Sequence, residues 1–248
     1  MEEFVHVKVK RQDSPDDLPY WEEFRVAYQP SMNVVMLLQM IQAKPMNADG
    51  VSTAPIACEY SCLEEVCGAC TMVINGRVRQ ACSALIDNLE QPITLEPMRK
   101  FAVVRDLKVD RSPLFDALKK VNAWVKLDGF HDQGPGPVTS SEDQQHAYQF
   151  ARCMMCGCCC DACPQYNERT DFVGPHAISQ VNLLNQHSIG KQSKGERLDS
   201  LMEDGGIADC GNAQNCAQVC PKEIPLTEAI ATVGWDATKR AVKKFLKG

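Results

Sequence analysis

The sequence has no long apolar segment. Its longest uninterrupted apolar run covers residues 34–38, far short of the roughly 18–20 residues that cross a bilayer. The first residues also lack the positive charge and the apolar stretch of a secretory signal. We therefore expect a protein with no transmembrane segment and no signal peptide, which stays in the cytoplasm, where thiols are kept reduced.

Positive charge and nucleotide-binding motifs are also scarce. The chain has 32 acidic and 26 basic residues, a net charge of −6, which argues against sequence-independent binding to nucleic acid. Neither a GxGxxG nor a Walker A pattern occurs, which excludes these two routes to a bound nucleotide. The five histidines lie apart from the cysteine runs, and we expect each to be a surface or core residue: His6, His131, His146, His176 and His187.

Cysteine, by contrast, is abundant. Fourteen of the 248 residues (14/248, about 5.6%) are cysteine. This fraction is below the roughly 8–10% of a small protein stabilised by disulfides. In a reducing compartment, metal binding is the first explanation for so many thiols. Five lie between positions 58 and 82, six between 153 and 163, and three between 210 and 220. The long stretch without cysteine after the first group suggests two domains, which we place at residues 1–104 and 105–248.

The hydropathy pattern predicts a small α+β domain first. Alternating residues 5–10 and the segment 21–28 are typical of half-buried strands, and residues 34–43 carry a helical apolar stripe. Two further strands, 71–74 and 77–80, flank Asn75-Gly76, which is the strongest short signal for a hairpin.

The second domain is predicted to be helical. Ser112 and Pro113 are suited to the N-cap and the first position of a helix that extends to residue 124. We expect further helices at 141–152, 175–187, 196–203 and 225–246. The second and third cysteine groups should then fall in loops between helices, and another loop should cover residues 126–141, which contain Gly-Pro-Gly-Pro.

The first cysteine group has the spacing of a plant-type ferredoxin. A triple with four and then two intervening residues is followed, after eleven more intervening residues, by a single cysteine, which gives the predicted 2Fe–2S ligands Cys62, Cys67, Cys70 and Cys82. Gly68 would let backbone N–H groups approach the sulfurs. A structural zinc site is the alternative, but zinc sites more often use two short-spaced pairs. We expect Cys58 to be a small core residue.

The second and third groups form a pair of bacterial ferredoxin runs. In two-cluster ferredoxins the fourth cysteine of each run binds the other cluster. This crossover assigns a 4Fe–4S cluster to Cys153, Cys156, Cys159 and Cys220.

The third group lacks one ligand, because Ala213 stands where the middle cysteine would be. Three thiolates remain, which predicts a 3Fe–4S cluster on Cys163, Cys210 and Cys216. One thiolate charge fewer should make this cluster easier to reduce. Cys158 and Cys160 fall outside the x2-x2-x3 register, and we interpret both as buried non-ligands.

This combination strongly resembles the iron–sulfur subunit of succinate dehydrogenase and fumarate reductase. The resemblance covers nearly the whole chain and rests on CLEEVCGAC at 62–70, NGR at 75–77, CMMCGCC at 153–159 and CP at 220–221. It implies an α+β fold, with an N-terminal β-grasp 2Fe–2S ferredoxin-like domain followed by an all-α ferredoxin domain. It also implies electron transfer from a FAD-containing flavoprotein, which holds the dicarboxylate site, to quinone in a haem-containing cytochrome b anchor. The chain would then lie on the cytoplasmic face of the cell membrane.

Two departures bear on the quinone. The ubiquinone-type members have a tryptophan shortly after the first Cys-Pro and a histidine after the first 3Fe–4S cysteine. Here Pro164 is followed by Gln-Tyr-Asn, and Gly211 follows Cys210, so these quinone residues are not carried over. The sequence is more similar to the menaquinone-linked branch. A fumarate reductase working in the opposite direction, a free-standing multi-cluster ferredoxin and a zinc-scaffold protein remain alternatives.

The C-terminal segment 239–247 is basic in an otherwise acidic chain. Lysines that favour a helix C-terminus explain this pattern, and contact with anionic lipid or an anchor subunit is the functional alternative.

Overall fold

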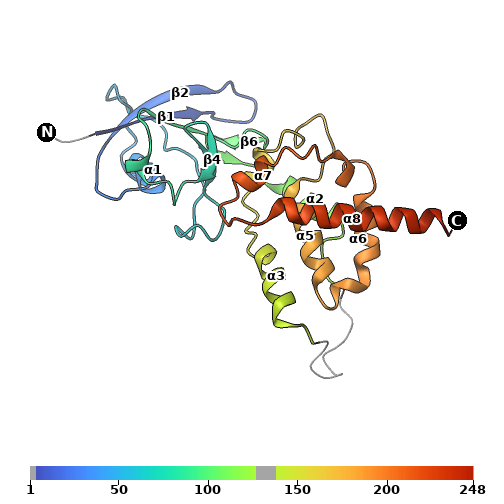
Figure 1. The fold of residues 1–248 in the computed structure, drawn as a ribbon. Helices are drawn as coiled ribbons and strands as arrows, with labels where there is room; N and C mark the ends of the chain where they lie inside the picture. Colours follow the sequence, from blue (N-terminus) through green and yellow to red (C-terminus); the bar gives the residue numbers. More distant parts are fainter. Residues whose placement is uncertain (1–3, 127–137, 248) are drawn as a thin grey trace. The chain divides into compact units, whose positions relative to one another are not determined.

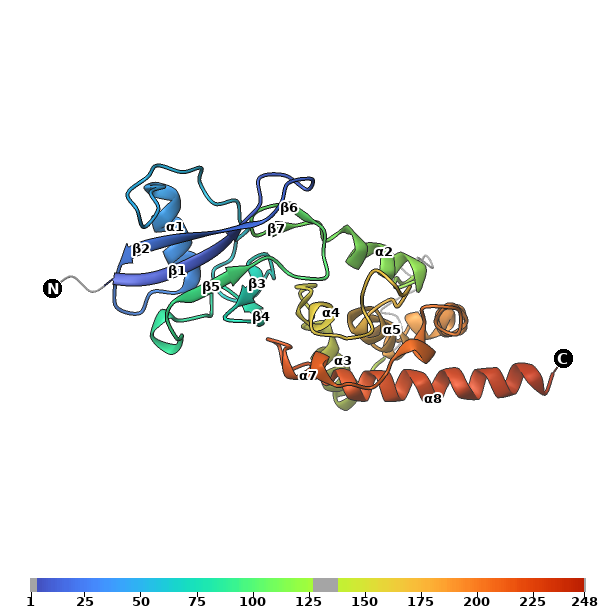
Figure 2. The ribbon, with the colours of Figure 1, turned by 90° about the horizontal axis from the view of Figure 1, so that it is seen from above.

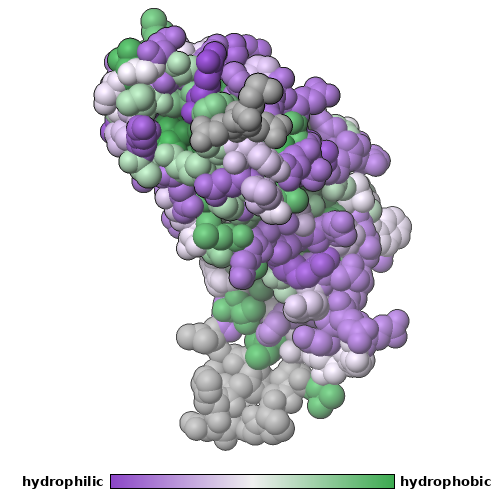
Figure 3. Space-filling view, turned by 90° about the vertical axis from the view of Figure 1, so that its left-hand side faces the viewer, coloured by the Kyte–Doolittle hydropathy of each residue, from purple (hydrophilic) through white to green (hydrophobic). Residues whose placement is uncertain are grey.

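The structure, a computed structural model, describes residues 4–126 and 138–247 (Figure 1). The chain divides into two compact units: residues 1–111 together with 154–161, and residues 112–153 together with 162–248. Most of the loop expected at 126–141, and His131 with it, lies outside the described residues. Among the residues that are described, no helix is long and apolar enough to span a membrane. The face in Figure 3 is mainly hydrophilic, with apolar residues in small groups.

The first unit is built on a mixed five-stranded sheet, in which α1 follows β2 and the strand order is β2-β1-β5-β3-β4 (Figure 2). β1 pairs in parallel with β5 and antiparallel with β2, and β3 pairs antiparallel with both β4 and β5. The expected α+β fold is therefore confirmed. The elements are β1 Phe4–Arg11, β2 Tyr20–Ala27, α1 Val34–Ala43, β3 Thr71–Ile74, β4 Arg77–Gln80 and β5 Ile93–Glu96.

Local sequence explains most of these elements. Val5, Val7 and Val9 alternate along β1 and are almost fully buried in the core, as period-two alternation predicts. α1 begins where the Asn33 side chain accepts a hydrogen bond from the Met36 amide, which is a normal N-cap. β5 was not predicted. It has four residues, too few for a clear period, although it is the central strand.

The second cysteine group was expected to lie in a loop, but part of it is helical. After Gly157, whose φ is +87°, the chain forms the short helix α4, Cys158–Asp161. The Asp161 carboxylate then accepts hydrogen bonds from the amides of Arg99 and Lys100, at 2.6 and 3.1 Å, and so ties α4 to the first unit. The remaining elements of this unit are the 3-10 helix Ile86–Asn88 and the two-stranded sheet of β6, Val103–Arg105, and β7, Lys108–Val109.

The second unit is helical, as predicted. Its apolar core includes Ile178 and Val181 of α5 and Val233 and Ala237 of α8. The helices are α2 Ser112–Lys120, α3 Ser141–Ala151, α5 Pro175–Gln186, α6 Lys194–Leu201, α7 Asn215–Gln218 and α8 Leu226–Phe245, with 3-10 turns at Gly190–Ser193 and Ile207–Asp209.

Two details of this unit differ from the prediction. α2 stops at Lys120 because Asn122 adopts φ +52° and the Ala123 amide donates to the carbonyl of Leu118. This 6→1 bond with a left-handed asparagine is a Schellman-type C-cap. Cys216 lies on the short helix α7 and not in a loop.

Candidate iron–sulfur centres

The β3–β4 hairpin positions two cysteines of the first set. Cys70 directly precedes β3 and Cys82 closely follows β4, and the Ala81 amide donates to the Cys70 carbonyl at 3.1 Å. Both side chains are buried, whereas Cys62 is half-buried and Cys67 is exposed. The hairpin therefore supplies a rigid base, and the preceding loop brings the other two cysteines.

Backbone amides of that loop point at the sulfurs. The Cys62 sulfur accepts hydrogen bonds from the amides of Glu64, Val66 and Cys67, at 3.4, 3.2 and 3.3 Å. The Glu65 amide donates to the Cys82 sulfur at 3.3 Å. Left-handed φ values of +62° at Leu63 and +56° at Glu65 turn the chain so that these amides face inward.

These donors favour thiolates. Backbone hydrogen bonds from Glu64 and Val66 lower the pKa of Cys62 to about 7. Burial, with Cys70 as a close neighbour, raises the pKa of Cys82 to about 12. A positively charged iron centre would stabilise the thiolate that burial alone disfavours. Four thiols around a loop of amide donors are the chemistry that a 2Fe–2S cluster requires, and the residues fit the group.

The first unit also carries half of the second set. Cys156 precedes α4 and Cys159 lies within it. The Cys158 thiol hydrogen-bonds to Cys156, and this bond is the largest contribution lowering the pKa of Cys156 to about 7. The same interaction, together with burial, raises the pKa of Cys158.

The pKa directions match the two predicted roles, because Cys156 is disposed to be a thiolate ligand and Cys158 a protonated neighbour. Cys158 and Cys160 are both fully buried. Cys153 and Cys220 belong to the second unit, where the Cys220 sulfur accepts a hydrogen bond from the Ile224 amide at 3.4 Å. The four-cysteine ligand set for 4Fe–4S therefore stays a prediction.

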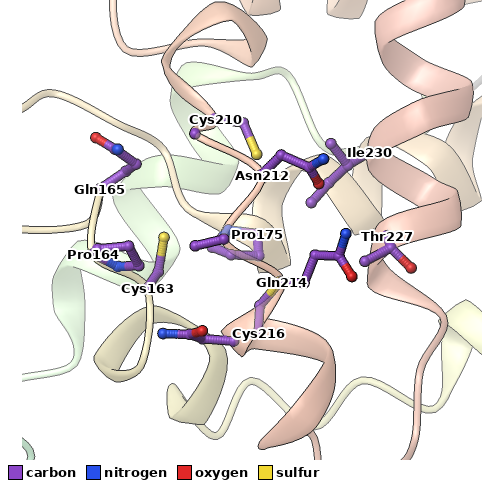
Figure 4. Close-up of a pocket in the computed structure, with 13 residues that line it drawn as sticks. Cys163, Pro164, Gln165, Pro175, Cys210, Asn212, Gln214, Cys216, Thr227 and Ile230 are labelled. Carbon is purple, nitrogen blue, oxygen red and sulfur yellow. The ribbon is translucent and has the colours of Figure 1, made fainter.

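The third set surrounds a cavity in the second unit. Its empty volume is about 350 Å³, part of it open to solvent, and Ala213 lines it together with Cys163, Cys210 and Cys216. Figure 4 shows the sulfurs of Cys163 and Cys210 directed into this space, from the loop before α5 and the loop before α7.

The loop that carries Ala213 is shaped by left-handed residues on both sides, with φ +51° at Asn212 and +61° at Gln214. The Asn215 amide group then donates to the carbonyl of Ala162 at 3.1 Å, which ties α7 to the chain beside Cys163. Three thiols and one methyl around a single cavity fit a cluster with three ligands. The assignment of this set to a 3Fe–4S cluster remains a prediction.

Comparison with known proteins agrees with this arrangement. The family description "2Fe-2S iron-sulfur cluster binding domain" matches residues 6–116, and "4Fe-4S dicluster domain" matches residues 149–224. The succinate dehydrogenase iron-sulfur subunit of Bacillus subtilis is 53% identical over 96% of this chain and 94% of its own length. The chain belongs to the family of succinate dehydrogenase and fumarate reductase iron–sulfur subunits.

Other relatives are more distant. The fumarate reductase iron-sulfur subunit of Mycobacterium tuberculosis is 35% identical, over 75% of this chain and 76% of its own length. That of Wolinella succinogenes is 29% identical, over 86% and 87%. A chain of the Mycobacterium smegmatis Sdh1 complex in the apo form has the same fold, with a TM-score of 0.79 at 21% identity, covering 97% of this chain and 98% of that one.

As a member of this family, the chain is an electron-transfer subunit with 2Fe–2S, 4Fe–4S and 3Fe–4S clusters. Two of the described histidines have partners of their own. His176 is buried and hydrogen-bonds to the Leu114 carbonyl at 3.0 Å, and His146 lies 2.7 Å from Glu228. Neither residue lines the cysteine cavity.

Sequence reasoning missed two residues that contact the cysteine sets. Gln80 accepts a hydrogen bond from the Cys70 thiol at 3.4 Å and donates one to the Cys158 sulfur at 3.6 Å. Arg111 donates to the loop that carries the first set. Gln80 is only two residues from Cys82, but a single glutamine in a strand is no signal for a contact with Cys70 or Cys158, and Arg111 is 29 residues from the nearest cysteine.

Proposed function

We propose that this chain is the iron–sulfur subunit of a succinate:menaquinone oxidoreductase. In this role it accepts electrons from a FAD-containing flavoprotein partner and delivers them to menaquinone in a haem-containing membrane anchor. The observation that carries the proposal is the division of the cysteines into sets of four, four and three, the last around one cavity with Ala213. The 53% identity to the Bacillus subtilis succinate dehydrogenase subunit supports oxidation of succinate as the physiological direction.

When bound, the clusters supply one-electron chemistry, and the chain's residues hold and shield them. Cys62, Cys67, Cys70 and Cys82 would hold 2Fe–2S, and the loop amides would stabilise its sulfurs. Cys153, Cys156, Cys159 and Cys220 would hold 4Fe–4S, and Cys163, Cys210 and Cys216 would hold 3Fe–4S. The chain contributes no catalytic residue to the dicarboxylate reaction, which belongs to the flavoprotein.

The loop of the first set is a suitable surface for the flavoprotein. Leu63 is 47% exposed and Val66 is 58% exposed, and Cys67 between them and the hairpin is exposed as well. Cys67 is the exposed member of this set of four. Exposed apolar side chains next to it favour a protein partner on this loop. The anchor subunit, in turn, would hold the chain on the cytoplasmic face of the cell membrane.

Co-purification from membranes tests the proposal. We expect a flavoprotein and a haem-containing subunit with this chain, and succinate-dependent reduction of menaquinone. Low-temperature EPR should show a 3Fe–4S signal in the oxidised complex and a 2Fe–2S signal after reduction. A stable, partner-free monomer with these signals would support the free-standing ferredoxin, and a colourless zinc protein would refute an electron-transfer role altogether.

A further inference from the structure

Arg111 is held against the loop of the first cysteine set. Its Nη1 donates to the Gly68 carbonyl at 2.6 Å, and its Nη2 donates to the carbonyl of Ala69. The side chain is only 16% exposed, and the Glu59 carboxylate lies 4.0 Å away, where Lys108 approaches it as well at 3.5 Å. Neutral carbonyls therefore satisfy most of the guanidinium, and its positive charge is only weakly compensated.

The remaining guanidinium donor of Arg111 has no acceptor among the described residues. Nε of Arg111 is buried and makes no hydrogen bond within the part of the chain that the structure describes. A buried donor without a partner is unfavourable, and such a group calls for an acceptor beyond those that the described residues supply. Sulfur atoms of bound clusters are acceptors of this kind.

The same loop touches the second cysteine set. A Cβ atom added at Gly68 would lie 2.9 Å from both Cα and Cβ of Cys156, and 3.0 Å from the carbonyl oxygen of Met154. The two ligand loops thus meet with no room for a side chain. Arg111, which donates to the Gly68 carbonyl, is therefore next to the loop of Cys156 as well.

We propose that Arg111 is a positioning residue shared by the first two clusters, whose charge raises the reduction potential of both. Its fork would hold the Gly68–Ala69 carbonyls in place, while its Nε–H remains available to a sulfur acceptor. A nearby positive charge stabilises the reduced cluster, which carries one more negative charge. The inference rests on the proposed function, since it presupposes that the cysteine sets hold clusters.

EPR-monitored redox titration of the purified complex tests this role. For Arg111→Gln, which removes the charge, we expect the oxidised-to-reduced ratio of the 2Fe–2S cluster at fixed ambient potential to rise about tenfold, or about 59 mV for one electron. The 4Fe–4S ratio should move in the same direction. Arg111→Lys keeps the charge and should shift either ratio by less than threefold. Arg105→Gln removes the same charge from a side chain that is 45% exposed and should change neither.

The outcomes separate this inference from the proposed function. Unchanged potentials in Arg111→Gln with both clusters present would overturn the role of Arg111 and leave the electron-transfer assignment intact. An equal shift in Arg105→Gln would also overturn it, because overall charge would then explain the result. If Arg111→Gln fails to retain its clusters, the test rests on Arg111→Lys, which keeps the charge. A tenfold change in its oxidised-to-reduced ratio would refute the role of the charge. Absence of both cluster signals in the parent protein would refute the proposed function itself.

Discussion

Replacement of Gly68 by alanine should separate the ligand loops of the first two cysteine sets. Gly68 adopts φ +74°, and a left-handed conformation costs an L-residue roughly 1–2 kcal/mol. The added methyl would also lie 2.9 Å from backbone and side-chain atoms of Cys156. Neither atom is the flexible end of a side chain, so the loops must move, and overpacking of this kind costs typically about 1–3 kcal/mol. We expect Gly68→Ala to lower the free energy of unfolding by about 2–5 kcal/mol.

Gly50 provides a matched control. Its φ is +78° and no atom lies within 4 Å of the position of its missing Cβ, so Gly50→Ala should carry the conformational cost alone, about 1–2 kcal/mol. The difference between the variants then measures the contact between Gly68 and Cys156. Urea unfolding of both variants gives this difference, and the 2Fe–2S EPR signal per protein gives the effect on the cluster.

The two variants should differ in both measurements. Gly68→Ala should lose cluster signal, whereas Gly50→Ala should retain it. Equal destabilisation by the two substitutions, with full 2Fe–2S content in each, would show that the close approach of the loops carries no energetic weight. It would also remove the geometric basis for assigning Arg111 to both clusters.

Three further substitutions test other parts of the chain. Ala213→Cys restores a fourth ligand to the cavity, and the oxidised 3Fe–4S EPR signal should give way to a 4Fe–4S signal of lower potential; an unchanged signal would show that the alanine is not what excludes the fourth iron. Asp106→Ala should cost about 3 kcal/mol in urea unfolding, because it leaves the fully buried Arg11, now 2.8 Å from Asp106, without its main partner. Asp199→Asn should cost about 1 kcal/mol at pH 7, since the bond from Arg240 lowers the pKa of Asp199 to about 2 and partial exposure screens the pair. Because the folded pKa is the lower one, this contribution is complete above about pH 4 and disappears as the pH falls towards 2; a deficit that stays constant between pH 7 and pH 3 would contradict this explanation.

Local patterns determined how much could be predicted from the sequence. The hairpin was predicted at its observed residues because the dipeptide Asn75-Gly76 specifies the turn by itself: both residues adopt positive φ, and the strands begin on either side of them. β5 was missed because its four residues gain their stability from β1 and β3 on either side, a tertiary effect that no local window contains. The early end of α2 depends on the left-handed conformation of Asn122, which asparagine tolerates without requiring it.

The same distinction holds for the centres. Cysteine spacing is a local property, so all eleven expected ligands could be proposed from the sequence. Gln80 donates to the sulfur of Cys158, 78 residues away, and Arg111 donates to the carbonyl of Gly68, 43 residues away, and only the fold brings these groups together. The eleven ligands that remain a prediction follow from spacing alone, whereas Gln80 and Arg111 follow only from the fold.

The charges around the three cysteine sets favour electron flow from the first set towards the third. The first set has four cysteines and amide donors to its sulfurs, and the third set has one cysteine fewer because of Ala213. A lower negative charge on the ligands raises the reduction potential, so the third set should accept electrons more readily than a four-thiolate site in the same place. If Arg111 also raises the potentials of the first two clusters, it reduces the driving force between the second and third sets while easing entry from the flavoprotein. The potential of the first cluster relative to the flavin would then depend on one buried cation, and Arg111→Gln should slow reduction by succinate more than it slows reoxidation by quinone.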